Sequence, residues 1–334
     1  ERLSIRGNSV KKYIFKTLAI LAASLFFLLI TGFFISGFFV VSDLPRSQVA
    51  DKYSNQNSMF ITLENGSTVH IRDEGNPDGE VLILLHGFGM SLHVWEKWVA
   101  ELGDTYRLVS FDWPGHGLST PVRDDDYSRN AMTSYLTNVL DWMNIDKFVL
   151  VGHAMGGGIA MNYIVDNPKK VQALVLIGAS GLKIDRSDEA PRIMKLTKYP
   201  GMSTALRYIT PYETLKNTVI RTYGSESFVN KELVDRYYEL MVNSTNREIY
   251  IKQIKQMSLD EPLDAHIGRL NHPTLLIWGE EDEIIGIKYA KRLRSIILSA
   301  RLVSYQGVGH LPMDVLPKVT AKDLTNFLNS EVFQ

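Results

Sequence analysis

The 334-residue chain contains no cysteine. It therefore cannot form a disulfide framework, a thiolate nucleophile, a zinc-thiolate site or an iron-sulfur cluster. The chain also lacks an excess of either charge, because 36 Lys and Arg side chains stand against 37 Asp and Glu side chains. Without a basic field to hold a phosphate backbone, we expect no nucleic-acid partner.

Motifs for metals and nucleotides are missing as well. No His-x-x-x-His spacing occurs, and the acidic runs at 124–126 and 280–283 lack the glycine-bearing pattern of a calcium loop. The glycines at 156–158 do not complete Gly-x-Gly-x-x-Gly. We therefore predict no metal and no cofactor.

One long apolar run lies near the start of the chain. Residues 17–42 carry no charge and would reach about 39 Å as a helix, enough to cross a hydrocarbon layer of about 30 Å. The run is longer than the apolar part of a signal peptide, and no small-residue cleavage site precedes Asp43. We predict a transmembrane helix over 17–42, a short N-terminal segment over 1–16 and a linker over 43–58.

The charges beside this run predict its orientation. Residues 1–16 hold five Lys and Arg against one Glu, which favours a cytoplasmic N-terminus and an extracytoplasmic C-terminal part. The resulting expectation is a single-pass membrane protein in contact with the bilayer. Gly32 and Ser36 have the small-xxx-small spacing that allows two such helices to form a homodimer.

Short apolar runs alternate with stretches of helical periodicity along the rest of the chain. These runs lie at 81–85, 107–111, 148–151, 173–177, 274–278 and 301–305. Two earlier runs, 59–64 and 67–73, flank Asn65-Gly66, which predicts a two-residue hairpin. The alternation predicts an α/β domain with a mostly parallel sheet.

The alternation stops after Gly181 and returns near residue 271. The intervening stretch reads as helices and loops. We therefore predict one core made of 59–180 and 271–334, with a helical cap, 181–270, inserted between its two parts.

The stretch with the most chemical information is VLVGHAMGGG, residues 149–158. It reads as a buried strand, a sharp turn and a helix that begins near Met155. Gly152 and Gly156 would let the strand and helix approach closely around a strained turn whose central side chain is pushed outward. Ala154 occupies that central position.

Here the sequence resembles the α/β-hydrolase family, whose elbow reads Gly-x-Ser-x-Gly, and the element order over 59–334 agrees. The resemblance implies an α/β-hydrolase fold with a nucleophile at position 154, where this chain has alanine. Strand 81–85 runs into His86-Gly87-Phe88-Gly89, which resembles the oxyanion loop of the family. The backbone N–H groups of Phe88 and Met155 would then be the oxyanion donors.

The resemblance also implies an acid and a base. Gly279-Glu280-Glu281-Asp282 follows strand 274–278, so Asp282 matches the acid, with Glu281 and Glu283 as alternatives. His310 follows strand 301–305 and matches the base. Nucleophile, acid and base then come in the order that the family uses.

Three residues beside these motifs could line the site. They are His86, Gly87 and His153. A neutral His153 bonded to the backbone is an equally good interpretation. We assign the run Asp112 to Gly117, which also resembles a turn of the family, to structure.

All the chemical groups of acyl transfer are therefore expected except the hydroxyl. Alanine is neither a nucleophile nor an acid or base, so this chain should be nearly inactive. Either a serine has been replaced by Ala154, or the chain is a natural non-catalytic member that binds a ligand. We favour replacement, because the neighbouring residues remain consistent with catalysis.

The apolar run and the apolar residues of the cap suggest a lipid substrate. The arrangement resembles the membrane-anchored monoacylglycerol lipases and single-span bacterial phospholipases A of the family. That resemblance implies hydrolysis of monoacylglycerol, lysophospholipid or phospholipid esters, with lipid ester or fatty acid as the ligand. Carbon-carbon bond hydrolysis by the same three residue types is the alternative within the family.

Overall fold

A computed structural model describes residues 13, 15–27, 31, 41–183, 211–244 and 246–333. Eight strands of these residues form one sheet in the order β1-β2-β4-β3-β5-β6-β7-β8. The strands are β1 (Ser58–Thr62), β2 (Thr68–Gly75), β3 (Val81–Leu85), β4 (Arg107–Phe111), β5 (Phe148–His153), β6 (Val171–Ile177), β7 (Thr274–Gly279) and β8 (Ala300–Tyr305). β2 is antiparallel to both of its neighbours, β1 and β4, and every other neighbouring pair is parallel, so the sheet is mostly parallel, as predicted.

The hairpin between β1 and β2 differs from the prediction. Leu63 donates a backbone hydrogen bond to Ser67 O, so the loop holds three residues rather than two. A two-residue type I′ turn needs positive φ at both central positions, and only Gly66 has it. The Asn65 side chain accepts from the Ser67 amide, which stabilises the alternative turn.

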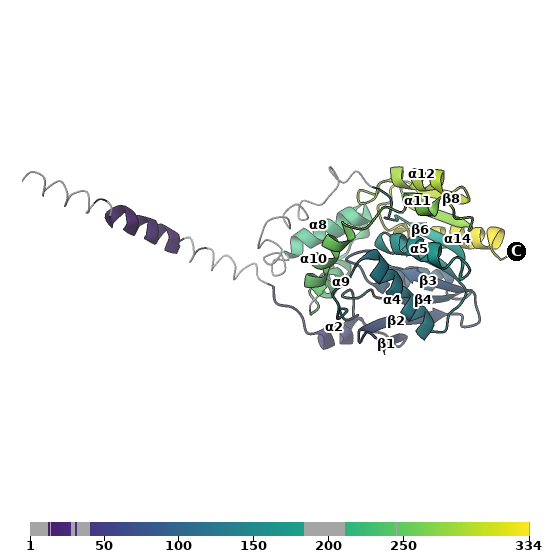
Figure 1. Cartoon of the computed structure of the whole chain (residues 1–334), viewed down its shortest axis with the longest axis horizontal. Coiled ribbons are helices and arrows are strands. Elements are labelled where there is room, and N and C mark those ends of the chain that lie inside the picture. Colours follow the sequence, from purple (N-terminus) through teal and green to yellow (C-terminus); the bar gives the residue numbers. More distant parts are fainter. Residues whose placement is uncertain are drawn as a thin grey trace, which may run out of the picture.

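Helices cover both faces of the sheet (Figure 1). One face packs on α4 (Arg129–Trp142), α5 (Met155–Asp166) and α12 (Ile287–Ile296). The other packs on α3 (Glu96–Leu102), α13 (Pro312–Val315) and α14 (Pro317–Glu331), with the 3-10 turn η1 (Leu92–Trp95) beside them. The central strand β5 is buried throughout, because it is covered on both sides.

Helices also fill the described part of the insertion between β6 and β7. They are α8 (Tyr212–Tyr223), η2 (Glu226–Phe228), α9 (Lys231–Met241), α10 (Asn246–Met257) and α11 (Asp264–Ile267). These helices agree with a helical insertion after β6. Residues 184–210 of the predicted cap lie outside the described residues, and its boundaries stay a prediction.

Only part of the predicted membrane span can be compared with the structure. Residues 15–27 are helical and exposed, whereas 28–30 and 32–40 lie outside the described residues. Among the helices of the described residues, none combines the length and the apolar character that crossing a bilayer requires.

The predicted linker contains a short helix and is attached to the cap. Helix α2 (Arg46–Tyr53) follows Asp43, whose carboxylate pairs with the buried side chain of Arg247. Leu44 adds a backbone hydrogen bond to Val242 O of 2.8 Å. The chain after the apolar run is therefore fixed to the segment that joins α9 and α10.

Candidate active site

The turn between β5 and α5 has the strained geometry of a nucleophile elbow. Ala154, at its centre, has φ 49° and ψ −115°, a combination that non-glycine residues rarely adopt. Its carbonyl accepts from the amides of Gly157 and Ser180 at 3.0 Å each and from Ser180 Oγ at 3.1 Å. These bonds hold the turn in a conformation that the alanine side chain does not favour.

Glycines allow the close packing that this turn needs. A Cβ atom at Gly156 would lie 2.4 Å from Leu85 O, and one at Gly152 would lie 2.5 Å from Gly156 O. Both contacts are with backbone, which cannot move aside as a flexible side chain could. The two glycines therefore bring α5 against β3 and β5, as the motif predicted.

His310 and Asp282 form a buried pair beside this turn. His310 Nδ1 lies 2.7 Å from Asp282 Oδ2, and the side chains are 2% and 0% exposed. The other carboxylate oxygen accepts from the amides of Ile284 and Ile285, each at 2.8 Å. A carboxylate held in this way accepts a hydrogen bond from Nδ1–H, so Nε2 of the imidazole keeps a free lone pair and can act as a base.

The two acidic alternatives to Asp282 have other partners. Glu281 accepts from the Val308 amide at 3.0 Å, and Glu283 lies 3.9 Å from Arg221. In the structure, Asp282 alone of the three bonds to the imidazole of His310.

Three contacts bring the His310 ring to the elbow. The rings of His153 and His310 lie 4.5 Å apart between centroids, and His153 Nε2 donates to the His310 carbonyl at 2.9 Å. A Cβ atom at Gly178 would lie 2.8 Å from His310 Nδ1, and Gly178 follows the residue whose carbonyl accepts from the Ala154 amide. The nucleophile position, the imidazole and the carboxylate therefore share one side of the sheet, at the carboxyl ends of its strands.

The backbone N–H groups of Phe88 and of Met155, the first residue of α5, have no hydrogen-bond acceptor among the described residues. Met155 is 4% exposed, and unpaired buried amides are rare. The helix dipole adds partial positive charge at this end of α5. Both groups are those that the resemblance implies as oxyanion donors, and that role stays a prediction.

His86 and Gly87 support the oxyanion loop. His86 is fully buried, and its Nε2 accepts from the Trp113 amide while its Nδ1 donates to Gly87 O. Burial lowers the pKa of His86, which keeps the ring neutral. Gly87 packs on the elbow, because a Cβ atom there would lie 2.9 Å from Ala154 Cβ. His86 therefore stabilises the loop through its hydrogen bonds, whereas Gly87 contacts the elbow.

His153 contributes to position rather than to proton transfer. It is fully buried, and burial lowers its pKa well below the usual value. Its donated bond to the His310 carbonyl ties the end of β5 to the segment after β8. This agrees with the interpretation of His153 as a neutral imidazole bonded to the backbone.

Asp112 organises the turn that the sequence assigned to structure. Its carboxylate accepts from the amides of Leu92 and Leu118 at 2.8 and 2.9 Å and bonds to His70 at 2.8 Å. These three contacts use both carboxylate oxygens.

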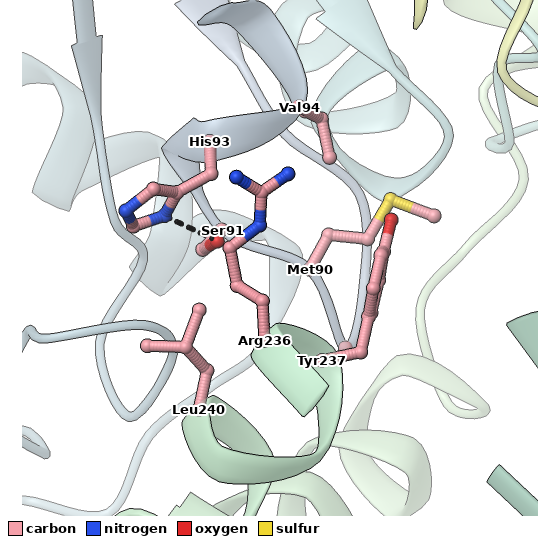
Figure 2. Close-up of a pocket in the computed structure, with 8 residues that line it drawn as sticks. Met90, Ser91, His93, Val94, Arg236, Tyr237 and Leu240 are labelled. Carbon is pink, nitrogen blue, oxygen red and sulfur yellow. Dashed lines mark hydrogen bonds between the residues drawn. The ribbon is translucent and has the colours of Figure 1, made fainter. Parts of the chain in front are cut away.

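Two pockets lie between core and cap. Figure 2 shows the first, where Arg236, Tyr237 and Leu240 of α9 face Met90 and His93, which follow the oxyanion loop. The second lies between α10 and the first turns of α5. Its lining residues are Tyr127, Arg129, Met132, Met155, Gly158, Ile159, Ser180, Gly181, Gln253, Met257 and Asp260.

Sequence reasoning did not identify Gln253 as a functional candidate. A glutamine in an amphipathic helix normally faces solvent, so nothing in the residue pattern of α10 marks it. Met194, Tyr199, Met202 and Tyr208 of the predicted apolar cap lie outside the described residues. No group of three or more His, Asp or Glu side chains in the described ranges could hold a metal ion.

Curated relatives of the chain include both ester and carbon-carbon hydrolases. Lipase 1 of Psychrobacter immobilis is 29% identical over 264 residues, which cover 76% of this chain and 78% of the lipase. The 2-hydroxymuconate semialdehyde hydrolase of Pseudomonas sp. strain CF600 is 27% identical, with 76% and 89% covered. A monoacylglycerol lipase of Xenopus laevis is 25% identical, with 77% of each chain covered.

Solved structures and the family comparison agree on the fold. A membrane phospholipase A, described as a bacterial virulence factor, has a TM-score of 0.71 at 20% identity and covers 96% of this chain and 98% of its own. At that identity the likeness concerns the fold alone. The family comparison matches residues 80–315, which include the elbow, the acid loop and the histidine loop. The chain therefore belongs to the alpha/beta hydrolase fold family.

Proposed function

We propose that this protein is a serine hydrolase of lipid carboxylic esters whose active form has serine at position 154. The observation that carries the proposal is the buried pair of His310 and Asp282 beside a strained elbow. This backbone conformation costs about 1–3 kcal/mol and gives an alanine no function. It does serve a nucleophile, because the strained turn points the central side chain toward the substrate.

In the proposed reaction, the serine hydroxyl attacks the ester carbonyl while His310 Nε2 takes its proton. Asp282 stabilises the imidazolium that forms. The amides of Phe88 and Met155 stabilise the oxyanion. His310 then protonates the leaving alcohol, and water hydrolyses the acyl-enzyme by the same steps. With Ala154 in place, the site binds the ester but lacks the attacking oxygen.

The lipid assignment rests on the relatives and on the apolar run. A lipase and a monoacylglycerol lipase are among the relatives. A transmembrane helix over 17–42, with a cytoplasmic N-terminus and the hydrolase domain on the opposite side, would keep the site near lipid. Dimerisation through Gly32 and Ser36, which lie outside the described residues, belongs to the same proposal.

Replacing the alanine tests the enzymatic part. Ala154→Ser should hydrolyse p-nitrophenyl butyrate and 1-octanoylglycerol with kcat higher than the parent chain by on the order of 10⁵-fold. The control adds Asp282→Asn to this variant and should lower kcat by about 10⁴-fold, because asparagine leaves the imidazole in the wrong tautomer to accept the serine proton. A folded Ala154→Ser protein without hydrolysis would instead support the non-catalytic binding protein.

Carbon-carbon bond hydrolysis is the second candidate. The relative that acts on 2-hydroxymuconate semialdehyde favours it, and it would use the same His310 and Asp282. The same Ala154→Ser protein, assayed with 2-hydroxymuconate semialdehyde and with 1-octanoylglycerol, separates the candidates by the ratio of kcat/KM. A higher value for the semialdehyde would overturn the ester assignment.

Alkaline extraction of membranes that carry the full chain tests the anchor. We expect the protein to stay in the pellet, and Leu29→Arg to weaken that retention, because a central charge costs about 2.5–3.5 kcal/mol on insertion. Release of the parent chain into the supernatant would contradict the anchor without affecting the hydrolase proposal.

A further inference from the structure

Gln253 has a buried carboxamide that no group among the described residues satisfies. The residue is 0% exposed, and neither Oε1 nor Nε2 has a hydrogen-bond partner. Burying an unpaired amide costs about 1–3 kcal/mol. Gln256, one turn later on α10, is used fully, since it accepts from the Tyr127 amide and donates to Asp125 O. Among the buried side chains of the described residues, Gln253 alone leaves two polar atoms unpaired, whereas Asn243 and Asn246 leave one each.

The carboxamide lines the pocket that reaches the elbow. Gln253 and Met257 are four residues apart, so they share one face of α10, and both line the second pocket. The opposite wall includes Met155, whose amide is a predicted oxyanion donor, and Ser180, which bonds to the Ala154 carbonyl. A molecule in this pocket would contact the elbow at one end and Gln253 along the cap.

The pocket offers no uncompensated charge among its described lining residues. Arg129 and Asp260 are its two charged residues, and their side chains lie 3.9 Å apart. Arg129 also donates to Glu261 O at 2.6 Å, and its amide donates to Asp260 Oδ1. The paired charges do not favour a carboxylate or phosphate group, which would require an additional cation.

A carboxamide has one acceptor oxygen and an NH₂ donor, so its natural partner is a hydroxyl group, which both donates and accepts. We infer that Gln253 is a specificity-determining residue that binds a hydroxyl of the alcohol part of a neutral ester, such as the glycerol of a monoacylglycerol. This deepens the proposed function and rests on it for the identity of the reacting ester. The apolar wall of Met132, Ile159 and Met257 covers the carbon skeleton of the same ligand.

Binding to the chain as it stands tests the inference, because Ala154 leaves the ester intact. The probes are 1-octanoylglycerol and methyl octanoate, which share the acyl chain and differ in hydroxyl groups. Calorimetry should show that Gln253→Leu weakens binding of the glycerol ester by about tenfold or more and changes binding of the methyl ester by less than about twofold. Gln253→Met is a second apolar variant of similar size.

Stability gives a readout that does not depend on the ligand. Replacing an unpaired buried amide with an apolar side chain should raise the melting temperature by about 2 °C or more. The matched control, Gln256→Leu, should lower the melting temperature, because it breaks two bonds, and should leave the ratio of the two affinities unchanged.

Three results would overturn the inference. The first is an equal loss of affinity for both esters in Gln253→Leu and Gln253→Met, and the second is no loss of affinity for either ester. The third is tighter binding of 1-octanoylglycerol 3-phosphate than of 1-octanoylglycerol. Failure of Ala154→Ser to hydrolyse esters would refute the proposed enzyme but not the selective binding. The two proposals can therefore fail separately.

Discussion

Ala154 has a strained backbone conformation, although its methyl side chain takes no part in acid-base or nucleophilic chemistry. Its φ of 49° places it among three non-glycine residues with positive φ in the described part of the chain. The carbonyl bonds to Gly157 and Ser180 maintain this conformation at the expense of stability. A residue that is strained and inert indicates a site shaped for a different side chain.

Ala154→Gly should therefore stabilise the protein. Glycine adopts this φ without steric cost, so the free energy of unfolding should rise by about 1 kcal/mol, after allowing for the greater entropy of unfolded glycine. Urea denaturation measures the change. The control is Ala160→Gly in the interior of α5, which should lower stability by about 0.5–1 kcal/mol or more. A loss at both positions would show that Ala154 is not strained.

Motif spacing singled out the elbow and the residues Asp282 and His310, which the structure brings together as a buried pair, whereas it could not locate Gln253. Asp282 and His310 follow strand ends, and parallel strands bring those ends together. The burial of Gln253 depends instead on where α10 lies relative to α4 and α5, whose residues line the same pocket, and no local pattern encodes that position. The roles of Phe88 and Met155 as donors remain predictions.

At the scale of elements, the approach of α5 to β3 and β5 positions the elbow. Gly156 provides it, because its α carbon faces the carbonyls of Leu85 and His86. Short apolar runs predicted these strands well, since each is buried on both faces. The β1-β2 loop was predicted one residue too short, because the Asn65 side chain stabilises a turn that the dipeptide alone does not indicate.

Gly156→Ala should lower the free energy of unfolding by about 3 kcal/mol or more. The added methyl would meet Leu85 O at 2.4 Å, and the sheet cannot yield locally. Gly268→Ala is the matched control, because the nearest atom to its Cβ would be 3.6 Å away and its φ is −65°. The control should change stability by less than about 1 kcal/mol. Equal effects in thermal unfolding would contradict the close approach of α5.

At the scale of the whole molecule, several buried histidines make stability depend on pH. Burial lowers the pKa of His93 to about 4 and that of His116 to about 3, against 6.5 for an exposed ring. The unfolded chain therefore binds more protons than the folded chain below pH 6.5, so stability falls as the pH falls. Burial alone would raise the pKa of Asp112, but its hydrogen bond to His70 helps to hold it below the usual value. Asp112 therefore stays ionised and keeps its contribution to stability over the pH range in which the histidines of the unfolded chain take up protons.

Urea denaturation between pH 7 and pH 5 should show this loss. Each buried histidine contributes up to about 1.4 kcal/mol per pH unit once the pH is well below 6.5. His93→Gln should reduce the slope by about that amount, because glutamine does not titrate. An unchanged slope in this variant would show that His93 takes up its proton in the folded protein.

The account as a whole depends on one relation, that position 154 is a nucleophile position served by His310. Covalent capture by a fluorophosphonate tests it most directly, because the reagent reacts with an activated serine hydroxyl and not with an ordinary one. Mass spectrometry of Ala154→Ser should find the phosphonyl group on residue 154, and adding His310→Gln should abolish it. A folded Ala154→Ser protein that stays unlabelled, or that is labelled equally without His310, would contradict the account.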